Sequence, residues 1–309
     1  MKTILITGVC GFTGKHFVDY IKDLGLDINI IGIDVKKSKL NSKRHFRFIK
    51  CDLLDKKRIS SIVRKICPDY IFHFAGVNFS NNYKRLLDYN VIATLNLLDA
   101  AVKNKTKSTP RILIVGSSAE YGITPLNKQP IIESIALRPV TPYGVSKASQ
   151  DLLSLQYYFQ HGLHIVLARP FNIIGPGQPS RFICGSLVGQ IKNMQSNKTS
   201  RLIVGNLHTK RDFVDIRDVV KVYWMLLRTK KNISGEVFNI GSGKAYSIRE
   251  IVEMLLSYCS FTVKIKQKRE IIRLNDIPYQ RASIAKIKRT IKWHPEIPIK
   301  ASLKDMLKT

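Results

Sequence analysis

Short apolar runs alternate with amphipathic stretches over the first half of the chain. Six runs rich in β-branched or aromatic residues are bounded by polar residues, Gly or Pro and predict strands, at residues 3–7, 28–34, 46–50, 70–74, 112–115 and 165–168. An apolar period of three to four residues predicts helices between them, at about 12–24, 56–66, 83–102 and 143–159. This alternation predicts an α/β fold of the Rossmann type, with a doubly wound parallel sheet of about six strands.

The pattern changes after Ala168. A turn-rich segment at 175–180 is followed by mixed helical patterns and by short apolar runs at 202–204 and 237–240. We therefore expect a first domain at residues 1–168 and a second, smaller α+β lobe at residues 169–309. Part of the second segment, about 212–242, is expected to pack back on the first domain.

The first predicted strand leads directly into a glycine-rich turn and then into a helix. Gly8, Gly11 and Gly14 are spaced three apart, with Phe12 and Thr13 between the last two. Glycines in this context let the chain turn sharply and let backbone N–H groups approach a pyrophosphate, and the helix N-terminus adds favourable partial charge. The turn therefore predicts a dinucleotide-binding site.

Other expected residues of that site follow neighbouring strands. Asp34 ends the second predicted strand, about 20 residues further on, where a carboxylate binds the hydroxyls of the adenosine ribose. Lys36, Lys37, Ser38 and Lys39 then form either a site that attracts a 2′-phosphate or an ordinary solvated loop, so NAD(H) and NADP(H) both stay open. Four more candidates lie at strand ends, where open α/β sheets bind ligands: Asp52, Leu53, Ala75 and Gly76.

Tyr143 and Lys147 form the second chemical signal. They are four residues apart on a helix that Thr141 and Pro142 begin, so both side chains lie on one face. A lysine ammonium there stabilises tyrosinate and brings the phenol pKa from about 10 towards the working pH, which suits it to exchange a proton with a substrate oxygen. Together with the dinucleotide turn, the pair predicts an oxidoreductase.

The charge balance suggests a different class of function. The chain has 51 Lys and Arg against 22 Asp and Glu, which gives a net charge of +29 and attracts polyanions. Basic residues cluster at 36–50 and 264–292, but no aromatic platform or recognition motif accompanies them. A basic, nucleic-acid-binding protein with a dinucleotide fold is therefore the non-enzymatic alternative, and no specific nucleic acid is predicted.

Cysteine spacing and hydropathy limit the setting. The five cysteines lie far apart, with no C-x-x-C pair and no zinc-ligand spacing, so we expect no metal site and a reducing, cytoplasmic location. Gly8 and Gly11 interrupt the apolar start, and no later run reaches the roughly 18 residues that a membrane span requires. We therefore expect a soluble protein with no membrane partner.

Several motifs carry a family resemblance. The glycine turn, Tyr143-x-x-x-Lys147 and the pair Ser117-Ser118 at the end of the fifth predicted strand resemble those of an extended short-chain dehydrogenase/reductase. Within that superfamily, the runs GSSAEYG (116–122), PYGVSK (142–147) and RPFNIIGPGQ (169–178) are most similar to those of the GDP-4-keto-6-deoxy-D-mannose reductases. The resemblance covers nearly the whole chain.

The resemblance implies a reaction in deoxysugar nucleotide biosynthesis. A reduced nicotinamide cofactor would deliver hydride to the C4 carbonyl of the sugar, and Tyr143 would protonate the developing alkoxide. Ser118 would hydrogen-bond the same oxygen, although the sequence does not decide between Ser117 and Ser118. Lys147 would also bind the nicotinamide ribose. The product would be GDP-D-rhamnose or GDP-6-deoxy-D-talose, and the residues alone do not fix this configuration or the choice of guanine over other bases.

The resemblance also implies substrate and subunit contacts. A diphosphate requires cationic, forked donors, and the candidates for the nucleotide-sugar site in the second lobe are Asn172, Arg211, Arg273 and Asp276. The helices at 83–102 and 143–159 would pair with those of a second copy in a homodimer.

Glu120 keeps enzymatic alternatives open. Related 4,6-dehydratases use a glutamate near this position as a base, but here Glu120 directly precedes Tyr121-Gly122, and a serine replaces the usual threonine. A structural role for Glu120 is equally expected. A nucleotide-sugar 4,6-dehydratase or a C4 epimerase is therefore the enzymatic alternative to a reductase.

Overall fold

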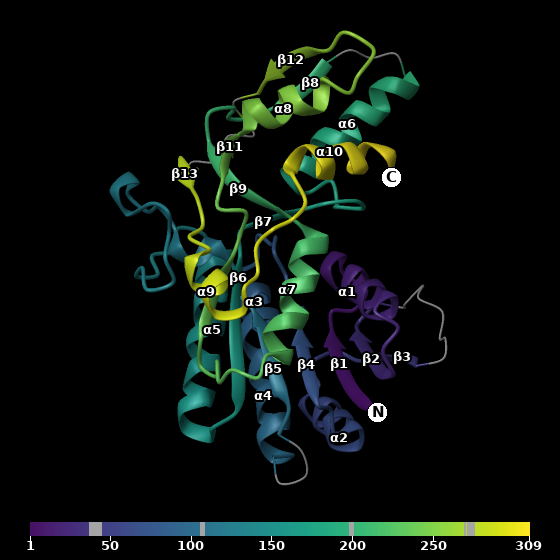
Figure 1. The fold of residues 1–309 in the computed structure, drawn as a ribbon, viewed down its shortest axis with the longest axis vertical. Coiled ribbons are helices and arrows are strands. Elements are labelled where there is room, and N and C mark those ends of the chain that lie inside the picture. Colours follow the sequence, from purple (N-terminus) through teal and green to yellow (C-terminus); the bar gives the residue numbers. More distant parts are fainter. Residues whose placement is uncertain (37–44, 106–108, 198–200, 269, 271–275) are drawn as a thin grey trace. The chain divides into compact units, whose positions relative to one another are not determined.

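Helices and strands alternate along the chain in the computed structural model, which describes all residues except 37–44, 106–108, 198–200, 269 and 271–275 (Figure 1). The strands are β1 (Lys2–Thr7), β2 (Ile28–Asp34), β3 (Phe46–Lys50), β4 (Tyr70–His73), β5 (Arg111–Val115), β6 (His164–Pro170), β7 (Asn172–Ile174), β8 (Arg201–Val204), β9 (Lys210–Asp215), β10 (Val237–Ile240), β11 (Ala245–Ser247), β12 (Lys264–Gln267) and β13 (Tyr279–Gln280). The α-helices are α1 (Phe12–Asp23), α2 (Lys56–Ile66), α3 (Tyr83–Leu87), α4 (Ala93–Lys103), α5 (Pro142–His161), α6 (Ile183–Asn197), α7 (Ile216–Arg228), α8 (Ile248–Leu256), α9 (Ala285–Ile291) and α10 (Ile299–Lys308). Three shorter helical segments are η1 (Asp88–Ile92), η2 (Ser118–Tyr121) and η3 (Leu126–Lys128).

The chain divides into two compact units. Unit 1 comprises Met1–Gly122, Ala136–Pro170 and Val220–Phe238, and unit 2 comprises Ile123–Ile135, Phe171–Val219 and Asn239–Thr309. Residues 123–135, which we expected in the first domain, therefore group with the second unit. The reason is a long-range pairing, because Ile131 bridges Ala282 and its carbonyl accepts a hydrogen bond from Asn239 Nδ2 at 2.9 Å.

The central sheet of unit 1 has the strand order β10-β6-β5-β4-β1-β2-β3. The pairs from β6 to β3 are parallel, which confirms the Rossmann-type, doubly wound sheet. The sheet has seven strands rather than about six, because β10 joins the edge beside β6. Strand order reverses between β1 and β4, and open α/β sheets bind ligands at such a point, outside the carboxyl ends of the strands.

Helices cover both faces of this sheet. On one face, α2, α4 and α5 bury side chains such as Ile59, Leu97 and Tyr157 in one core with the strand residues. On the other face, Phe17 of α1 and Trp224 of α7 contact Phe72 of β4, with ring centroids 4.3 and 6.2 Å apart respectively. Burial on both faces explains why the strands appear in the sequence as continuous apolar runs rather than alternating ones.

The structure has helical backbone throughout the predicted helix at 83–102, with the π-helical turn η1 lying between α3 and α4. The buried Asn90 lies in this turn. Its Oδ1 accepts a hydrogen bond from Val77 N at 2.8 Å, and its Nδ2 donates to Val77 O at 2.9 Å and to Ser146 Oγ at 2.8 Å. A π-turn of this kind often marks a functional site.

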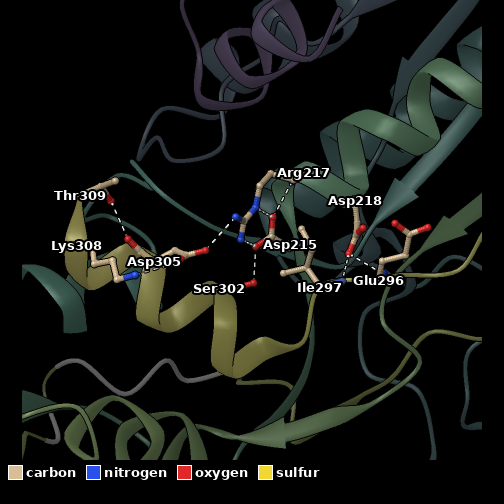
Figure 2. A network of polar contacts seen from close by, with 9 residues as sticks. All are labelled: Asp215, Arg217, Asp218, Glu296, Ile297, Ser302, Asp305, Lys308 and Thr309. Carbon is tan, nitrogen blue, oxygen red and sulfur yellow. Dashed lines mark hydrogen bonds and ion pairs between the residues drawn. The ribbon is translucent and has the colours of Figure 1, made fainter. Parts of the chain in front are cut away.

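Unit 2 contains a sheet in the order β11-β9-β13, with β7 also paired to β9, and a two-stranded sheet of β12 and β8. Helices α6, α8 and α10 contribute to its hydrophobic core. Figure 2 shows how polar contacts attach α10: Arg217 donates to Asp215 Oδ2 at 2.8 Å and to Asp305 Oδ2 at 2.9 Å, and Ser302 donates to Asp215. The C-terminal helix is therefore tied to the end of β9 by charge as well as by packing.

None of the described helices is both long and apolar enough to cross a membrane.

Candidate active site

The turn after β1 requires glycine at two of its three motif positions. Gly8 has a φ of +70°, and a Cβ there would lie 2.6 Å from the Ala75 nitrogen. A Cβ at Gly14 would lie 2.5 Å from Gly8 O. Gly11 is different, because a Cβ there would meet only Gly8 O, at 3.1 Å, among the described atoms within 4 Å. The turn is therefore packed tightly on the protein side and open beside Gly11.

Helix α1 begins at this open side. Gly11 is its N-cap and offers no side-chain hydrogen bond, and Phe12 and Thr13 form the first turn. The exposed N–H groups and the partial positive charge of a helix N-terminus suit a phosphate. Asp34 lies beside the turn, where its Oδ2 accepts from Cys10 N at 2.9 Å and its Oδ1 accepts from Lys36 N at 3.0 Å.

The remaining predicted cofactor residues have identifiable contacts. Asp52 Oδ1 accepts from Leu54 N at 2.9 Å, Leu53 is buried in the core of unit 1, and Ala75 N donates to Thr7 Oγ1 at 3.3 Å. Gly76 has no room for a side chain, because a Cβ there would lie 2.8 Å from Asn90 Oδ1. The residues at 37–39, which bear on the choice between NAD(H) and NADP(H), lie outside the described residues.

These observations fit a dinucleotide. The open glycine backbone, the uncapped helix start and a fixed carboxylate at the end of β2 are the donor and acceptor set that a pyrophosphate and an adenosine ribose require.

Tyr143 and Lys147 project from the first two turns of α5. Thr141 Oγ1 caps this helix by accepting from Gly144 N at 3.1 Å, and Pro142 follows in the first turn. The Tyr143 hydroxyl is hydrogen-bonded to the side chain of Ser117. Burial raises the pKa of Tyr143 to about 12, against the opposing effect of this hydrogen bond. In the protein alone, Tyr143 is therefore a protonated acid at neutral pH.

The serine side chain that acts on this hydroxyl is that of Ser117, the neighbour of the predicted Ser118. Ser117 has extended backbone angles of −162° and 147° and is the N-cap of η2, whereas Ser118 is the buried first residue of that turn. Successive side chains on an extended segment point to opposite sides, so a choice between two adjacent serines depends on where the strand ends. Ser117 therefore joins the predicted Ser118 as a candidate partner of the substrate oxygen.

Lys147 is buried, and two acceptors bind its ammonium. Nζ donates to Val115 O and to Gln150 Oε1, each at 2.5 Å. Within the described part of the chain, no acceptor takes the third N–H. Burial lowers the pKa of Lys147 to about 8, although the nearby Glu120 and Asp151 act in the opposite direction. One N–H of a charged lysine is thus available to a ligand.

Glu120 is fully buried, and its contacts favour the structural role over that of a base. Oε1 accepts from Ser117 N at 2.6 Å, and Oε2 lies 2.9 Å from Arg169 Nε. The same Arg169 Nε donates to Asp151 Oδ2 at 2.8 Å. Burial and the adjacent Asp151 raise the pKa of Glu120 well above its usual range. A buried glutamate whose two oxygens are engaged in this way supports the serine turn rather than removing a proton from a sugar.

Sequence reasoning missed Asn90, Arg169 and Asp151 as members of this site. Each is buried among the catalytic candidates through contacts between distant elements, namely η1, β6 and α5. The signal available in the sequence was the presence of polar residues inside otherwise apolar elements, because buried polar groups are retained where they have partners.

Two of the four predicted substrate residues lie on paired strands of one sheet in unit 2, and a third, Asp276, contacts one of them. Asn172 of β7 donates through Nδ2 to Asp212 O of β9 at 2.9 Å. Arg211, also on β9, donates to Asp276 Oδ1 at 2.8 Å and is half-buried. Arg273 lies outside the described residues. The structure thus brings Asn172 and Arg211 to paired strands, with Arg211 already bonded to the Asp276 carboxylate.

Comparisons with known proteins agree with this architecture. A GDP-6-deoxy-D-mannose reductase from Pseudomonas aeruginosa is 32% identical over 99% of this chain and 96% of its own length. A GDP-6-deoxy-D-talose 4-dehydrogenase from Aggregatibacter actinomycetemcomitans is 29% identical over 89% of this chain and 86% of its own length. The solved structure of RMD from Pseudomonas aeruginosa complexed with NADPH has a TM-score of 0.84 and 30% identity, and covers 100% of this chain and 98% of that one.

The family model described as GDP-mannose 4,6 dehydratase matches residues 5–306, almost the full chain. This match agrees with the extended short-chain dehydrogenase/reductase motifs and with the fold of unit 1. The chain belongs to the GDP-mannose 4,6-dehydratase family.

Proposed function

We propose that this chain reduces the C4 keto group of a GDP-4-keto-6-deoxyhexose, with NADPH or NADH as the reductant. The substrate would be GDP-4-keto-6-deoxy-D-mannose, and the product would be GDP-D-rhamnose or GDP-6-deoxy-D-talose. The observation that carries the proposal is the Ser117–Tyr143–Lys147 arrangement in the same unit as a dinucleotide turn. The names of the two relatives, a reductase and a dehydrogenase of GDP-deoxyhexoses, support the substrate class.

The residues of the chain would manage the proton. When bound, the reduced nicotinamide supplies a hydride. Tyr143 would donate its phenolic proton to the C4 oxygen, Ser117 would hydrogen-bond the same oxygen, and Lys147 would stabilise the resulting tyrosinate. The free N–H of Lys147 would also hold the nicotinamide ribose, which orients the two reactants.

Unit 2 would hold the nucleotide part of the substrate. Arg211 and Asn172 would bind the diphosphate. Arg211 would exchange its hydrogen bond to Asp276 for one to the diphosphate, or Asp276 would bind a ribose hydroxyl. Arg273 remains part of this proposal on its motif alone.

A second copy of the chain would cover an apolar face of unit 1. Leu152 and Phe159 on α5 are 61% and 78% exposed, and Tyr83 and Ile92 on the neighbouring helical segments are 58% and 42% exposed. We propose a homodimer through α3–α4 and α5, in a cytoplasmic enzyme. Sedimentation as a monomer at micromolar concentration would exclude the dimer, whereas conversion of a dimer to monomer by Phe159→Asp would support it.

The test of the function is to supply GDP-4-keto-6-deoxy-D-mannose with NADPH or NADH and to follow the loss of reduced cofactor. Tyr143→Phe should lower turnover about 10²- to 10⁴-fold, because the proton donor is lost, while cofactor affinity changes little. Tyr258→Phe removes a hydroxyl that bonds Lys300 O in unit 2 and is the matched control. Wild-type activity in Tyr143→Phe would contradict the mechanism.

A parallel assay separates the alternatives. GDP-mannose with oxidised cofactor should give no product. Formation of the keto sugar without net change in the cofactor would instead indicate a 4,6-dehydratase, and inversion at C4 would indicate an epimerase. Salt-sensitive nucleic-acid binding with full function in Tyr143→Phe would favour the non-enzymatic alternative.

The pH profile gives an independent check. The reaction requires the Lys147 ammonium, whose pKa is lowered to about 8 by burial. Turnover should therefore fall as pH rises through about 8, long before the Tyr143 phenol ionises. A profile that stays flat to pH 10 would argue against this role of Lys147.

A further inference from the structure

A chain of buried hydrogen bonds connects the end of β1 to the catalytic lysine. Thr7 Oγ1 lies 2.7 Å from His73 Nδ1, and His73 Nε2 lies 2.9 Å from Thr94 Oγ1. Gln150 Nε2 donates to the same Thr94 oxygen at 2.8 Å, and Gln150 Oε1 accepts from Lys147 Nζ at 2.5 Å. All five residues belong to unit 1, and Thr7, His73, Thr94 and Gln150 are each at most 1% exposed.

The direction of every bond in this chain is fixed by counting protons. The single hydroxyl proton of Thr94 goes to Asn90 O, at 2.7 Å, so its oxygen must accept from both neighbours. His73 therefore carries its proton on Nε2, and its Nδ1 accepts from the Thr7 hydroxyl. Burial lowers the pKa of His73 to about 3, with a smaller effect from the Lys147 charge, so the ring stays neutral.

The same counting fixes the side-chain amide of Gln150. Since Thr94 can only accept from it, the NH₂ group faces Thr94 and the carbonyl oxygen faces Lys147. That carbonyl and Val115 O, on β5, take two of the three ammonium protons. The third N–H then points along the one direction that the tetrahedral nitrogen has left.

We propose that Gln150 is a positioning residue for Lys147, and that Thr94 and His73 hold Gln150 in the orientation that keeps its carbonyl on the ammonium. The inference rests on the proposed function of Lys147 as the group that supports Tyr143 and the nicotinamide ribose. Gln150 touches neither the substrate nor the cofactor, and acts by directing the free N–H and by stabilising the charged form of Lys147.

Two consequences distinguish this role from simple packing. Loss of the Gln150 carbonyl removes an acceptor from the ammonium, so the neutral amine becomes more favourable and the pKa of Lys147 falls. The other groups that act on Lys147 are Glu120 of η2, Asp151 of α5 and His73 of β4, and they stay in place. The fall in turnover at high pH, here called the basic limb of the activity profile, should then move to lower pH, by about one unit for one charge-assisted hydrogen bond.

The experiment compares Gln150→Met and Thr94→Val with two controls in the full-length protein. Thr94→Ser keeps the hydroxyl, and Ser154→Ala deletes a buried hydroxyl of α5 that donates to Gln150 O at 2.7 Å. Gln150→Met and Thr94→Val should lower kcat about 10- to 100-fold, the weight of a hydrogen bond to a charged group, and should shift the basic limb. Both controls should retain the wild-type limb.

Two readouts do not depend on turnover. NADPH affinity, measured by fluorescence titration, should weaken in Gln150→Met and Thr94→Val and stay unchanged in the controls. Nitrogen-15 NMR should show His73 as the Nε2–H tautomer in the wild type and in Thr94→Ser, and a changed ring signal in Thr94→Val. Equal behaviour of Thr94→Val and Thr94→Ser, or a wild-type basic limb in Gln150→Met, would overturn the proposal. If the wild type reduces no GDP-keto sugar, the proposed function fails, while NADPH affinity and the His73 tautomer still decide the positioning role.

Discussion

The same capping motif, a serine followed three residues later by a glutamate, occurs in both units with opposite surroundings. In unit 2, Ser247 begins α8, and the exposed Glu250 accepts from Ser247 N at 2.7 Å. In unit 1, Ser117 begins η2, and the fully buried Glu120 accepts from Ser117 N at 2.6 Å. The two motifs share the hydrogen bond from the serine N–H to the glutamate carboxylate, but Ser117 Oγ accepts from Ala119 N, whereas Ser247 Oγ accepts from Glu250 N. They differ most in their surroundings, since Glu120 is fully buried and Glu250 is exposed.

Exposure to solvent shifts the pKa values of the two glutamates in opposite directions. The hydrogen bonds from Ser247 lower the pKa of Glu250, as expected where water also stabilises the carboxylate. Burial and the neighbouring Asp151 raise the pKa of Glu120 well above its usual range. The exposed motif therefore only starts a helix, whereas the buried motif also places Ser117 on Tyr143 and adds titratable groups beside Lys147. A capping box, which ordinarily only begins a helix, is thus part of the candidate catalytic site.

The largest expected effect is on stability, from removal of Arg169, which pairs with the buried Glu120 but has no counterpart beside the exposed Glu250 among the described residues. Arg169→Met leaves Glu120 and Asp151 buried without the guanidinium, which should lower the free energy of unfolding by about 3–5 kcal/mol. Urea denaturation at pH 7 measures this loss. If Arg169→Met costs no more than about 1 kcal/mol, the buried cluster is not held by charge, and the contrast between the two motifs fails.

The second-largest expected effect is the loss of activity when the serine of the buried motif is replaced. Ser117→Ala removes a hydroxyl from the oxygen-binding position and should lower kcat/KM about 10²- to 10³-fold, because a positioned donor acts most strongly in the transition state. Ser247→Ala is the matched control: it should cost about 1 kcal/mol of stability as a lost N-cap and leave kcat/KM unchanged. Steady-state kinetics and urea denaturation of both variants separate the two roles. Equal kinetic effects in the two variants would show that Ser117 acts only as a cap.

Much of this arrangement was predictable from the sequence, because its signals are local. The strand runs, the glycine turn and the spacing of Tyr143 and Lys147 each depend on a few consecutive residues whose geometry a helix or a strand fixes. The fold class was therefore predicted correctly, and the two residues lie on one helix as expected.

The remainder depends on contacts between distant segments, which local patterns do not contain. The contact of Ser117 with Tyr143 depends on where β5 gives way to η2, and the raised pKa of Glu120 depends on its burial beside Asp151. The grouping of residues 123–135 with unit 2 depends on a bridge to Ala282. In each case the sequence supplied the residue type, and only the assembled fold supplied its partner.

The smallest effect is the sharpest test, because the two glutamates should respond to pH with opposite signs. A raised folded-state pKa means that the stability from Glu120 is fully present below the unfolded value of about 4.3 and is lost as pH rises. Glutamine resembles the protonated acid, so Glu120→Gln should become more stable relative to the wild type as pH increases above about 4.3. The lowered pKa of Glu250 has the opposite consequence: its stabilisation is present above about 4.3 and is lost as pH falls below that value, so Glu250→Gln should become less stable relative to the wild type as pH rises towards about 4.3. Urea denaturation of the three proteins between pH 3 and pH 8 measures both differences, and two curves of the same sign would show that burial does not raise the pKa of Glu120.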